Sequence, residues 1–186
     1  LISRAVEKAR MNIRLDKLEK MMGLMYSFDS ILGESKALKE AVSLARKVSV
    51  TDVPVLLTGE TGTGKELVAR AIHGYGNRRT QPFVVQNCAS LPDGLLESEL
   101  FGYKKGAFTG ADRNHQGMFD AAHNGILFLD ELPEFERRVL DALREPIESG
   151  QIHISRTRAK ISYPARFQLV AAMNPSPTGH YQGNHN

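Results

Sequence analysis

The sequence has one cysteine, Cys88, and lacks any long hydrophobic run. A single cysteine excludes an internal disulfide and fits a reducing cytoplasm. Its place beside an apolar stretch favours a small buried side chain over a nucleophile. No apolar run approaches the ~20 residues of a membrane-spanning helix, and the six histidines lack the spacing of a zinc site. We therefore expect a cytoplasmic protein without membrane contact, and the charged first residues predict no signal peptide.

The composition is that of a globular domain of ordinary size. Of the 186 residues, 41% are hydrophobic and 24% are charged, which is enough for a buried core. The net charge of +3 and the isoelectric point of about 9.0 fit either contact with phosphates or nucleic acid, or an ordinary Lys- and Arg-rich surface. Because the chain begins at Leu1 and ends in a polar stretch at Asn186, we expect a fragment of a longer protein.

The first 26 residues predict a helix ahead of the domain. Its apolar residues repeat at alternating spacings of four and three, the seam of a short coiled coil; they are Met11, Leu15, Leu18, Met22 and Met25. The pattern favours either a linker that dimerises or a solvated helix that packs on its own domain. We therefore divide the chain into a linker helix, residues 1–26, and a domain, residues 27–186.

Strands and helices alternate along the domain. Helices are predicted at 35–50, 65–73, 93–100 and 134–148, the last interrupted by Pro146. Buried strands are predicted at 53–57, 83–87, 126–129 and 167–172, and a hairpin at 151–155 and 160–163. The glycine-rich segment 102–112 is predicted to be irregular. This alternation predicts an α/β fold, an open parallel sheet with helices on both faces.

A glycine-rich loop joins the first strand to the helix at 65–73. Between a strand and a helix, such a loop turns backbone N–H groups around a phosphate, and the helix N-terminus adds its dipole. Its residues are Gly59, Glu60, Thr61, Gly62, Thr63, Gly64, Lys65 and Glu66. Lys65 supplies a positive charge for the outer phosphates. We therefore predict that the chain binds ATP, with magnesium as the accompanying ion.

Glu66 stands where the general loop pattern has a Ser or Thr hydroxyl that binds magnesium. Two roles are open for it. Its carboxylate could help to hold the metal, or it could be an acid of the first helical turn that the helix dipole favours.

Polar side chains stand at the ends of the other predicted strands. Asp130 and Glu131 follow an apolar run, so a buried strand would deliver two carboxylates to its carboxyl edge, where ligands bind in such sheets. Asp130 would hold magnesium and Glu131 would polarise the attacking water. Asn174 would bond the water or the γ-phosphate, and Asn87 would hold Glu131. The alternatives are helix-capping carboxylates and turn-forming asparagines.

A flexible loop follows the third predicted helix. Two glycines and two alanines surround one aromatic and one hydroxyl side chain; the loop consists of Gly106, Ala107, Phe108, Thr109, Gly110 and Ala111. An exposed aromatic on a mobile loop suits a surface that grips a partner. The alternative is a loop whose Phe108 inserts into the core.

These motifs together resemble the AAA+ domain of bacterial sigma-54-dependent transcriptional activators over residues 31–122. The resemblance is carried by 59–70 with its Glu66, by 87–89, by 99–102 and above all by 106–111. It implies a P-loop NTPase of AAA+ type in a homo-oligomer, a hexameric ring, that hydrolyses ATP. It also implies that the loop 106–111 engages sigma-54 of the RNA polymerase closed complex, that Ile31 and Gly33 lie near the adenine, and that DNA is bound through domains outside this chain.

From about residue 122 onward the sequence looks more like magnesium-chelatase-related AAA+ ATPases, close to a competence-associated DNA-processing subgroup. The motifs are 123–125, 130–135, 144–146, 154–156 and 174–175. A natural mosaic and a join of two sequences both account for this change. In both families the arginine fingers, the sensor-two arginine and the helical lid lie beyond the position of Asn186. Three functions therefore stay open: a sigma-54 activator ATPase, a DNA-processing ATPase, and a nucleotide-binding oligomerisation module without turnover.

Overall fold

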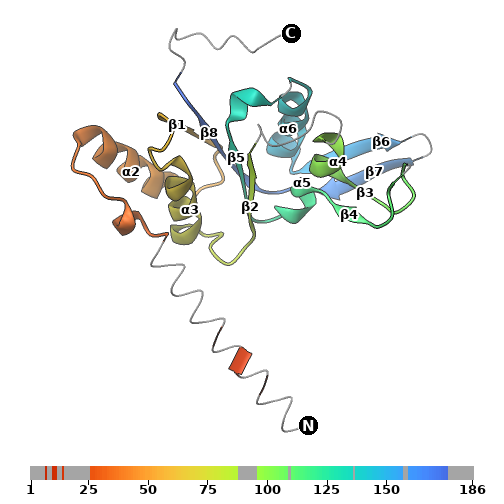
Figure 1. Ribbon diagram of the computed structural model, residues 1–186, viewed down its shortest axis with the longest axis horizontal. Helices are drawn as coiled ribbons and strands as arrows, with labels where there is room; N and C mark the ends of the chain where they lie inside the picture. The colour runs from red at the N-terminus through yellow and green to blue at the C-terminus, as the bar shows by residue number, and fades with distance from the viewer. Residues whose placement is uncertain are drawn as a thin grey trace.

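A four-stranded parallel sheet lies at the centre of the computed structural model, which describes residues 7, 10, 11, 14, 26–87, 96–108, 110–135, 137–156 and 159–175. Its strands, in spatial order, are β1 (Val55–Thr58), β8 (Gln168–Met173), β5 (Ile126–Asp130) and β2 (Phe83–Asn87) (Figure 1). Each strand lies within two residues of its predicted bounds. The predicted parallel α/β sheet is therefore confirmed.

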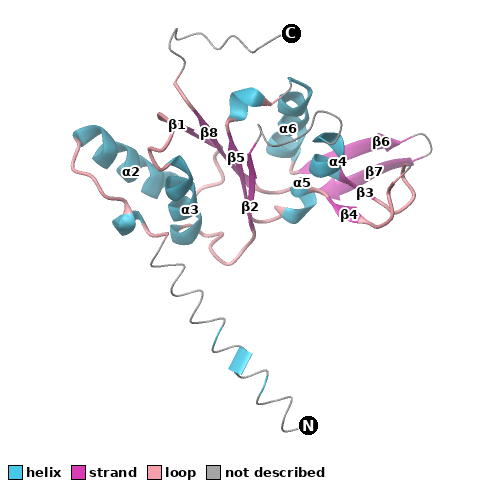
Figure 2. Ribbon diagram, viewed as in Figure 1, coloured by secondary structure: helices cyan, strands magenta, loops and turns pink. Residues whose placement is uncertain are grey.

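Helices cover both faces of this sheet (Figure 2). On one side lie the short 3-10 helix η1 (Phe28–Ser30), α2 (Lys36–Val48) and α3 (Lys65–Tyr75), and on the other lie α4 (Leu96–Phe101), α5 (Met118–Ala121) and α6 (Arg137–Ser149). A second 3-10 helix, η3 (Leu132–Glu134), follows β5. The start of α2 is fixed by Ser35, whose hydroxyl accepts a hydrogen bond from the Leu38 amide at 3.2 Å.

The alternation of side chains along the central strands builds two separate hydrophobic cores. Leu127 and Leu129 of β5 face a core with α4, α5 and α6, whereas Ile126 and Phe128 face a core with α3 and η1. All four side chains are buried. A strand covered on both faces needs a continuous apolar sequence, which is why the run from 126 to 129 identified it.

Two hairpins extend from one end of the domain. The first, β6 (Gln151–Arg156) with β7 (Ala159–Pro164), is the antiparallel hairpin predicted from the sequence. The second, β3 (Gly102–Tyr103) with β4 (His115–Gln116), was not predicted. The expectation of an irregular segment at 102–112 was therefore wrong for its first two residues, which form β3. Strands of two residues carry no alternation that a sequence pattern can detect.

The predicted interruption at Pro146 was wrong, because α6 continues through Pro146 to Ser149. Proline removes one helical hydrogen bond. However, Val139, Leu143 and Pro146 are all buried and share one helix face at spacings of four and three residues. Burial of this stripe holds the last turn in place.

The N-terminal segment is described at four positions only, 7, 10, 11 and 14, and all four are helical. The other positions of the predicted coiled-coil seam lie outside the described residues, as do Cys88 and Thr109. No helix within the described ranges is long and apolar enough to cross a membrane.

Candidate functional site

The carboxyl ends of the four parallel strands meet at one edge of the sheet, and the predicted site residues lie there. Parallel pairing sets Thr58 beside Met173 and Asn87 beside Asp130. The Gly59 amide, just after β1, donates to the Met173 carbonyl at 3.2 Å. The strand order therefore brings segments far apart in the sequence to the glycine-rich loop.

The loop after β1 turns through glycines that adopt left-handed backbone angles. Gly62 has a φ of 79° and Gly64 has a φ of 85°, a conformation that only glycine adopts readily. Gly64 is the N-cap of α3 and has no side chain to cap the helix. The first amides of α3 are therefore available to an anion, the arrangement by which helix N-termini bind phosphate.

Lys65 is bound within the loop and to the neighbouring strand. Its Nζ donates to the carbonyls of Gly59 at 2.7 Å and Glu60 at 2.9 Å, and to the Oδ1 of Asn174 at 2.9 Å. The amide nitrogen of Asn174 donates to the Thr61 hydroxyl at 3.2 Å. Asn174 thus joins the side chains of two loop residues, Lys65 and Thr61, at the carboxyl edge of the sheet.

The two predicted carboxylates follow β5 at the same edge. Asp130 ends the strand, and its Oδ1 accepts a hydrogen bond from the Glu131 amide at 3.0 Å. Glu131 has a φ of 55°, a left-handed conformation that costs a non-glycine residue about 1 kcal/mol or more. This turn directs the chain away from the sheet directly after Asp130. Asn87, the predicted partner of Glu131, pairs in register with Asp130.

Glu66 is held by an arginine one turn along α3. Its Oε1 accepts from Arg70 Nε at 2.8 Å and lies 2.7 Å from Arg70 Nη2. The Arg70 guanidinium lies over the rings of Tyr26 and Phe83. The sequence contains one sign of this arrangement, the four-residue spacing of Glu66 and Arg70 on a helix, but the two aromatic partners come from distant segments.

The residues predicted to lie near the adenine line a cavity between η1 and α2. Its volume is about 260 Å³, and its wall includes Ile31, Gly33, Leu38 and Val42. Ile31 also packs against the hydrophobic core that contains α3. No residue of the glycine-rich loop lines this cavity, so its relation to the base stays a prediction.

The segment 106–111 forms a closed loop at the end of the β3–β4 hairpin. The Gly106 amide donates to the Ala111 carbonyl at 2.8 Å, and the Ala111 amide donates to the Phe108 carbonyl at 3.0 Å. The Phe108 side chain is 46% exposed. It therefore lies on the surface, not in the core.

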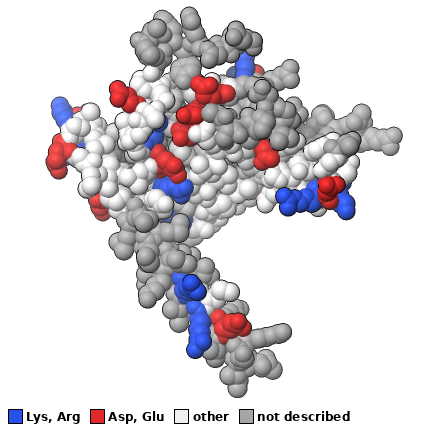
Figure 3. All heavy atoms as spheres, viewed as in Figure 1, with Lys and Arg blue, Asp and Glu red and all other residues white. Residues whose placement is uncertain are grey.

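Phe108 rests on a short series of side chains that sequence reasoning missed. Its ring meets the Tyr103 ring edge-on, with centroids 4.9 Å apart, and Tyr103 stacks on His115 at 5.2 Å. His115 Nε2 lies 3.1 Å from a Glu99 carboxylate oxygen. These contacts join the loop to β3, β4 and α4. In the space-filling view, basic side chains gather beside this hairpin (Figure 3); Lys104, Lys105 and Arg113 are exposed there.

The donor set at the sheet edge fits a magnesium ion that arrives with a nucleotide. Magnesium is usually bound by one or two carboxylates together with substrate phosphates and water, and Asp130 supplies a carboxylate at the carboxyl edge of the sheet, which also carries the loop. No cluster of three or more His, Cys, Asp or Glu side chains occurs in the described part of the chain. Glu66 is engaged with Arg70 and Asp130 accepts from the Glu131 amide, so the choice of metal ligand stays a prediction.

A family model, the sigma-54 interaction domain, matches residues 31–184. The chain is 53% identical over 145 residues to the uncharacterized protein YifB of Escherichia coli strain K12, covering 71% of this chain and 29% of YifB. It is 42% identical over 176 residues to the transcriptional activator RocR of Bacillus subtilis strain 168, covering 95% of this chain and 37% of RocR. The chain thus spans less than two fifths of each relative.

Among solved structures, the chain is similar to NtrX from Brucella abortus in complex with ATP. The TM-score is 0.73 at 26% identity, over 95% of this chain and 37% of NtrX. NtrX has also been solved in complex with ADP. The family match continues across residue 122, where the sequence begins to resemble magnesium-chelatase-related ATPases; that second resemblance stays a prediction.

Proposed function

The chain belongs to the family of sigma-54 interaction domains, and on this premise we propose that it is the ATP-binding and ATP-hydrolysing part of a transcription activator that remodels the sigma-54 RNA polymerase closed complex. In this proposal magnesium accompanies the nucleotide, and the intact protein acts as a cytoplasmic homo-oligomer, a hexamer. DNA is bound by domains outside this chain.

One observation carries the nucleotide part of the proposal: Lys65 and Asn174 meet at the glycine-rich loop although they lie 109 residues apart. The loop amides would bind the phosphates, and Lys65 would exchange its carbonyl partners for phosphate oxygens. Asn174 would then bond the γ-phosphate or the attacking water. Asp130 would hold the magnesium ion, and Glu131 would polarise the water.

The exposed Phe108 supports the partner part of the proposal. It stands on a loop closed by backbone hydrogen bonds, away from the sheet edge that carries Lys65. The family to which the chain belongs is described by its interaction with sigma-54. We assign this interaction to the loop formed by Gly106, Ala107, Phe108, Thr109, Gly110 and Ala111.

A DNA-processing ATPase is the second candidate, and it is supported by the resemblance of residues 122–186 to magnesium-chelatase-related AAA+ ATPases. A third candidate is a nucleotide-binding oligomerisation module. A missing arginine finger lowers turnover by about 10³–10⁵. If this group comes from outside residues 1–186, these residues alone would bind ATP and hydrolyse almost none of it.

The three candidates separate in one assay series on the intact protein that contains these 186 residues, because turnover in the proposal needs an arginine finger from outside them. ATP affinity and phosphate release are measured for the intact protein and for its Glu131→Gln variant, alone and with sigma-54 or duplex DNA added. The proposal expects ATP binding that survives Glu131→Gln and turnover that responds to sigma-54. Stimulation by DNA alone would instead identify the processing ATPase, and binding without phosphate release under every condition would identify the module.

A further inference from the structure

The guanidinium group of Arg70 lies over two aromatic rings that come from different parts of the chain. Its central carbon is 4.9 Å from the centre of the Tyr26 ring and 5.0 Å from the centre of the Phe83 ring. Tyr26 precedes η1, and Phe83 begins β2. Cation–π attraction to both rings holds the guanidinium group, and the edge of this planar group forms its hydrogen bonds.

That edge is occupied by Glu66. Both Nε and Nη2 of Arg70 lie within 2.8 Å of the same carboxylate oxygen. Glu66 directly follows Lys65, so its carboxylate lies on the first turn of the helix whose amides face the phosphate site. An unpaired carboxylate at this position would repel the phosphates of a nucleotide.

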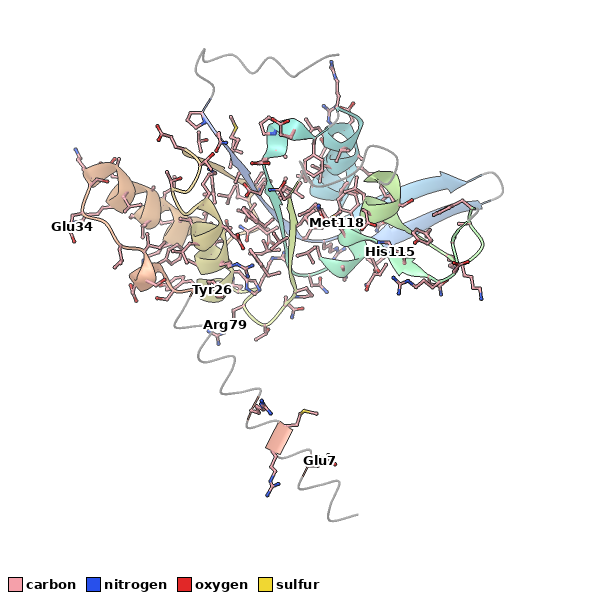
Figure 4. All side chains as sticks on the ribbon, in the orientation of Figure 1. Glu7, Tyr26, Glu34, Arg79, His115 and Met118 are labelled. Atoms are coloured by element: carbon pink, nitrogen blue, oxygen red, sulfur yellow. The ribbon has the colours of Figure 1, made fainter. Side chains whose placement is uncertain are left out.

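Tyr26 is itself fixed on α3. A Cβ atom built on Gly74 would lie 3.3 Å from the Tyr26 carbonyl oxygen, so the backbone at Tyr26 approaches α3 where the helix has no side chain. Figure 4 places Tyr26 beside α3. Tyr26 thus contacts α3 with its backbone at Gly74 and with its ring at Arg70.

We propose that Arg70 is a positioning residue that keeps the Glu66 carboxylate away from the phosphates, and that the Tyr26 ring holds Arg70 in this position. The N-terminal segment and the nucleotide loop are then coupled through Tyr26, Arg70 and Glu66. This coupling rests on the proposed nucleotide binding. Displacement of Tyr26 would release Arg70, and the freed carboxylate would weaken ATP binding.

A double-mutant cycle tests the electrostatic step. The dissociation constant for ATP is measured with the chain, Arg70→Ala, Glu66→Gln and the double variant. Arg70→Ala should weaken binding about fivefold, the effect expected of one partly screened charge near the phosphates. Glu66→Gln added to Arg70→Ala should restore binding to within about twofold of the parent. A double variant as weak as Arg70→Ala would show that Arg70 acts by packing alone and would overturn the proposal.

Two further variants keep the test decisive. Arg79→Ala removes an exposed arginine of the same region and should leave ATP affinity unchanged. Tyr26→Ala removes only the covering ring, so it should weaken binding in the same direction as Arg70→Ala and be rescued by Glu66→Gln. If Arg70→Ala does not fold, Tyr26→Ala with and without Glu66→Gln gives the same answer.

A spectroscopic readout tests the coupling directly. The sequence contains no tryptophan, so Tyr26→Trp introduces a single reporter against the Arg70 guanidinium. ATP should change its emission in the parent background and leave it unchanged after Arg70→Ala. An equal ATP response in both backgrounds would overturn the coupling.

Failure of nucleotide binding itself is distinguishable from failure of this coupling. If the parent and Lys65→Ala both lack ATP binding, the proposed function fails. The Arg70–Glu66 contact is then measured by urea unfolding: Glu66→Gln should lower the unfolding midpoint more in the parent than in Arg70→Ala, where only the interaction with the helix dipole is lost. Equal effects in both backgrounds would contradict the contact.

Discussion

The ammonium group of Lys65 lies 2.9 Å from the side-chain oxygen of Asn174, a residue 109 positions later in the chain. The order of the strands produces this contact, because β8, which ends just before Asn174, lies directly beside β1, which leads into the loop. The side chain expected to sense the γ-phosphate therefore touches the side chain expected to neutralise it.

Asn174→Ala should reduce ATP hydrolysis far more than ATP binding. Lys65 keeps its bonds to the carbonyls of Gly59 and Glu60, so the loop retains its shape and the dissociation constant should change by less than about threefold. Loss of a positioned hydrogen bond to the reacting group should slow phosphate release about 10²-fold or more.

Equilibrium titration with ATP and a phosphate-release assay measure both quantities for Asn174→Ala, with Lys65→Ala as the variant that should lose binding. If Asn174→Ala loses binding as completely as Lys65→Ala, Asn174 shapes the loop and does not act on the γ-phosphate.

Tyr103→Ala should loosen the loop that carries Phe108. The Tyr103 ring supports Phe108 edge-on at 4.9 Å, and an aromatic pair of this kind contributes about 0.5–1.5 kcal/mol. The amides of Gly106 and Ala111, which hold the loop closed, should then exchange with solvent about threefold to tenfold faster in hydrogen exchange. Tyr103→Phe keeps the ring and is the control; equally fast exchange in Tyr103→Phe would assign the effect to the hydroxyl.

Gln168→Leu should destabilise the domain although the substitution is apolar and similar in size. Gln168 is buried, and its Nε2 lies 3.2 Å from the Val53 carbonyl and 3.4 Å from the Val48 carbonyl. Removing the donor leaves the Val53 carbonyl without this partner at a cost of about 1–3 kcal/mol. Urea unfolding measures the difference, and an unchanged midpoint would show that water replaces the amide.

His73 should make the domain less stable in mild acid. Desolvation by burial lowers the pKa of His73 below its ordinary value of 6.5, and the charge of Arg70 lowers it further, against backbone hydrogen bonds that raise it. The unfolded chain therefore binds a proton more readily than the folded domain, so the stabilising contribution is complete above pH 6.5 and decreases as the pH falls below it.

This contribution is measured by the melting temperatures of the parent chain and of His73→Gln between about pH 5.5 and pH 7.5, a range centred on the ordinary pKa of histidine. The parent should lose more stability than His73→Gln over this range. Parallel curves for the two proteins would contradict the assignment to His73.

The sequence predicts the central sheet well because its strands are covered on both faces. The run from Ile126 to Leu129 is apolar at every position, and the carboxylates that follow it mark its end. The glycines before Lys65 identify the loop, because the backbone geometry that binds phosphate is set by residues that are neighbours in the sequence.

Contacts between distant segments lie beyond such patterns. Tyr26 and Phe83 both meet Arg70 of α3 through tertiary packing, and nothing in their local sequence pairs them. The β3–β4 hairpin is too short to show a period, and the interruption predicted at Pro146 was overridden by burial of one face of α6. Tertiary packing decided each of these cases.

The most direct test of the account is the association of the chain with sigma-54 in the presence and absence of a non-hydrolysable ATP analogue, for the parent and for Thr109→Ala. Arg79→Ala, which alters an exposed residue outside the loop, is the control. The account predicts that the parent and the control bind sigma-54 when nucleotide is present and that Thr109→Ala does not. Binding that is retained by Thr109→Ala, or that is independent of nucleotide, would contradict it.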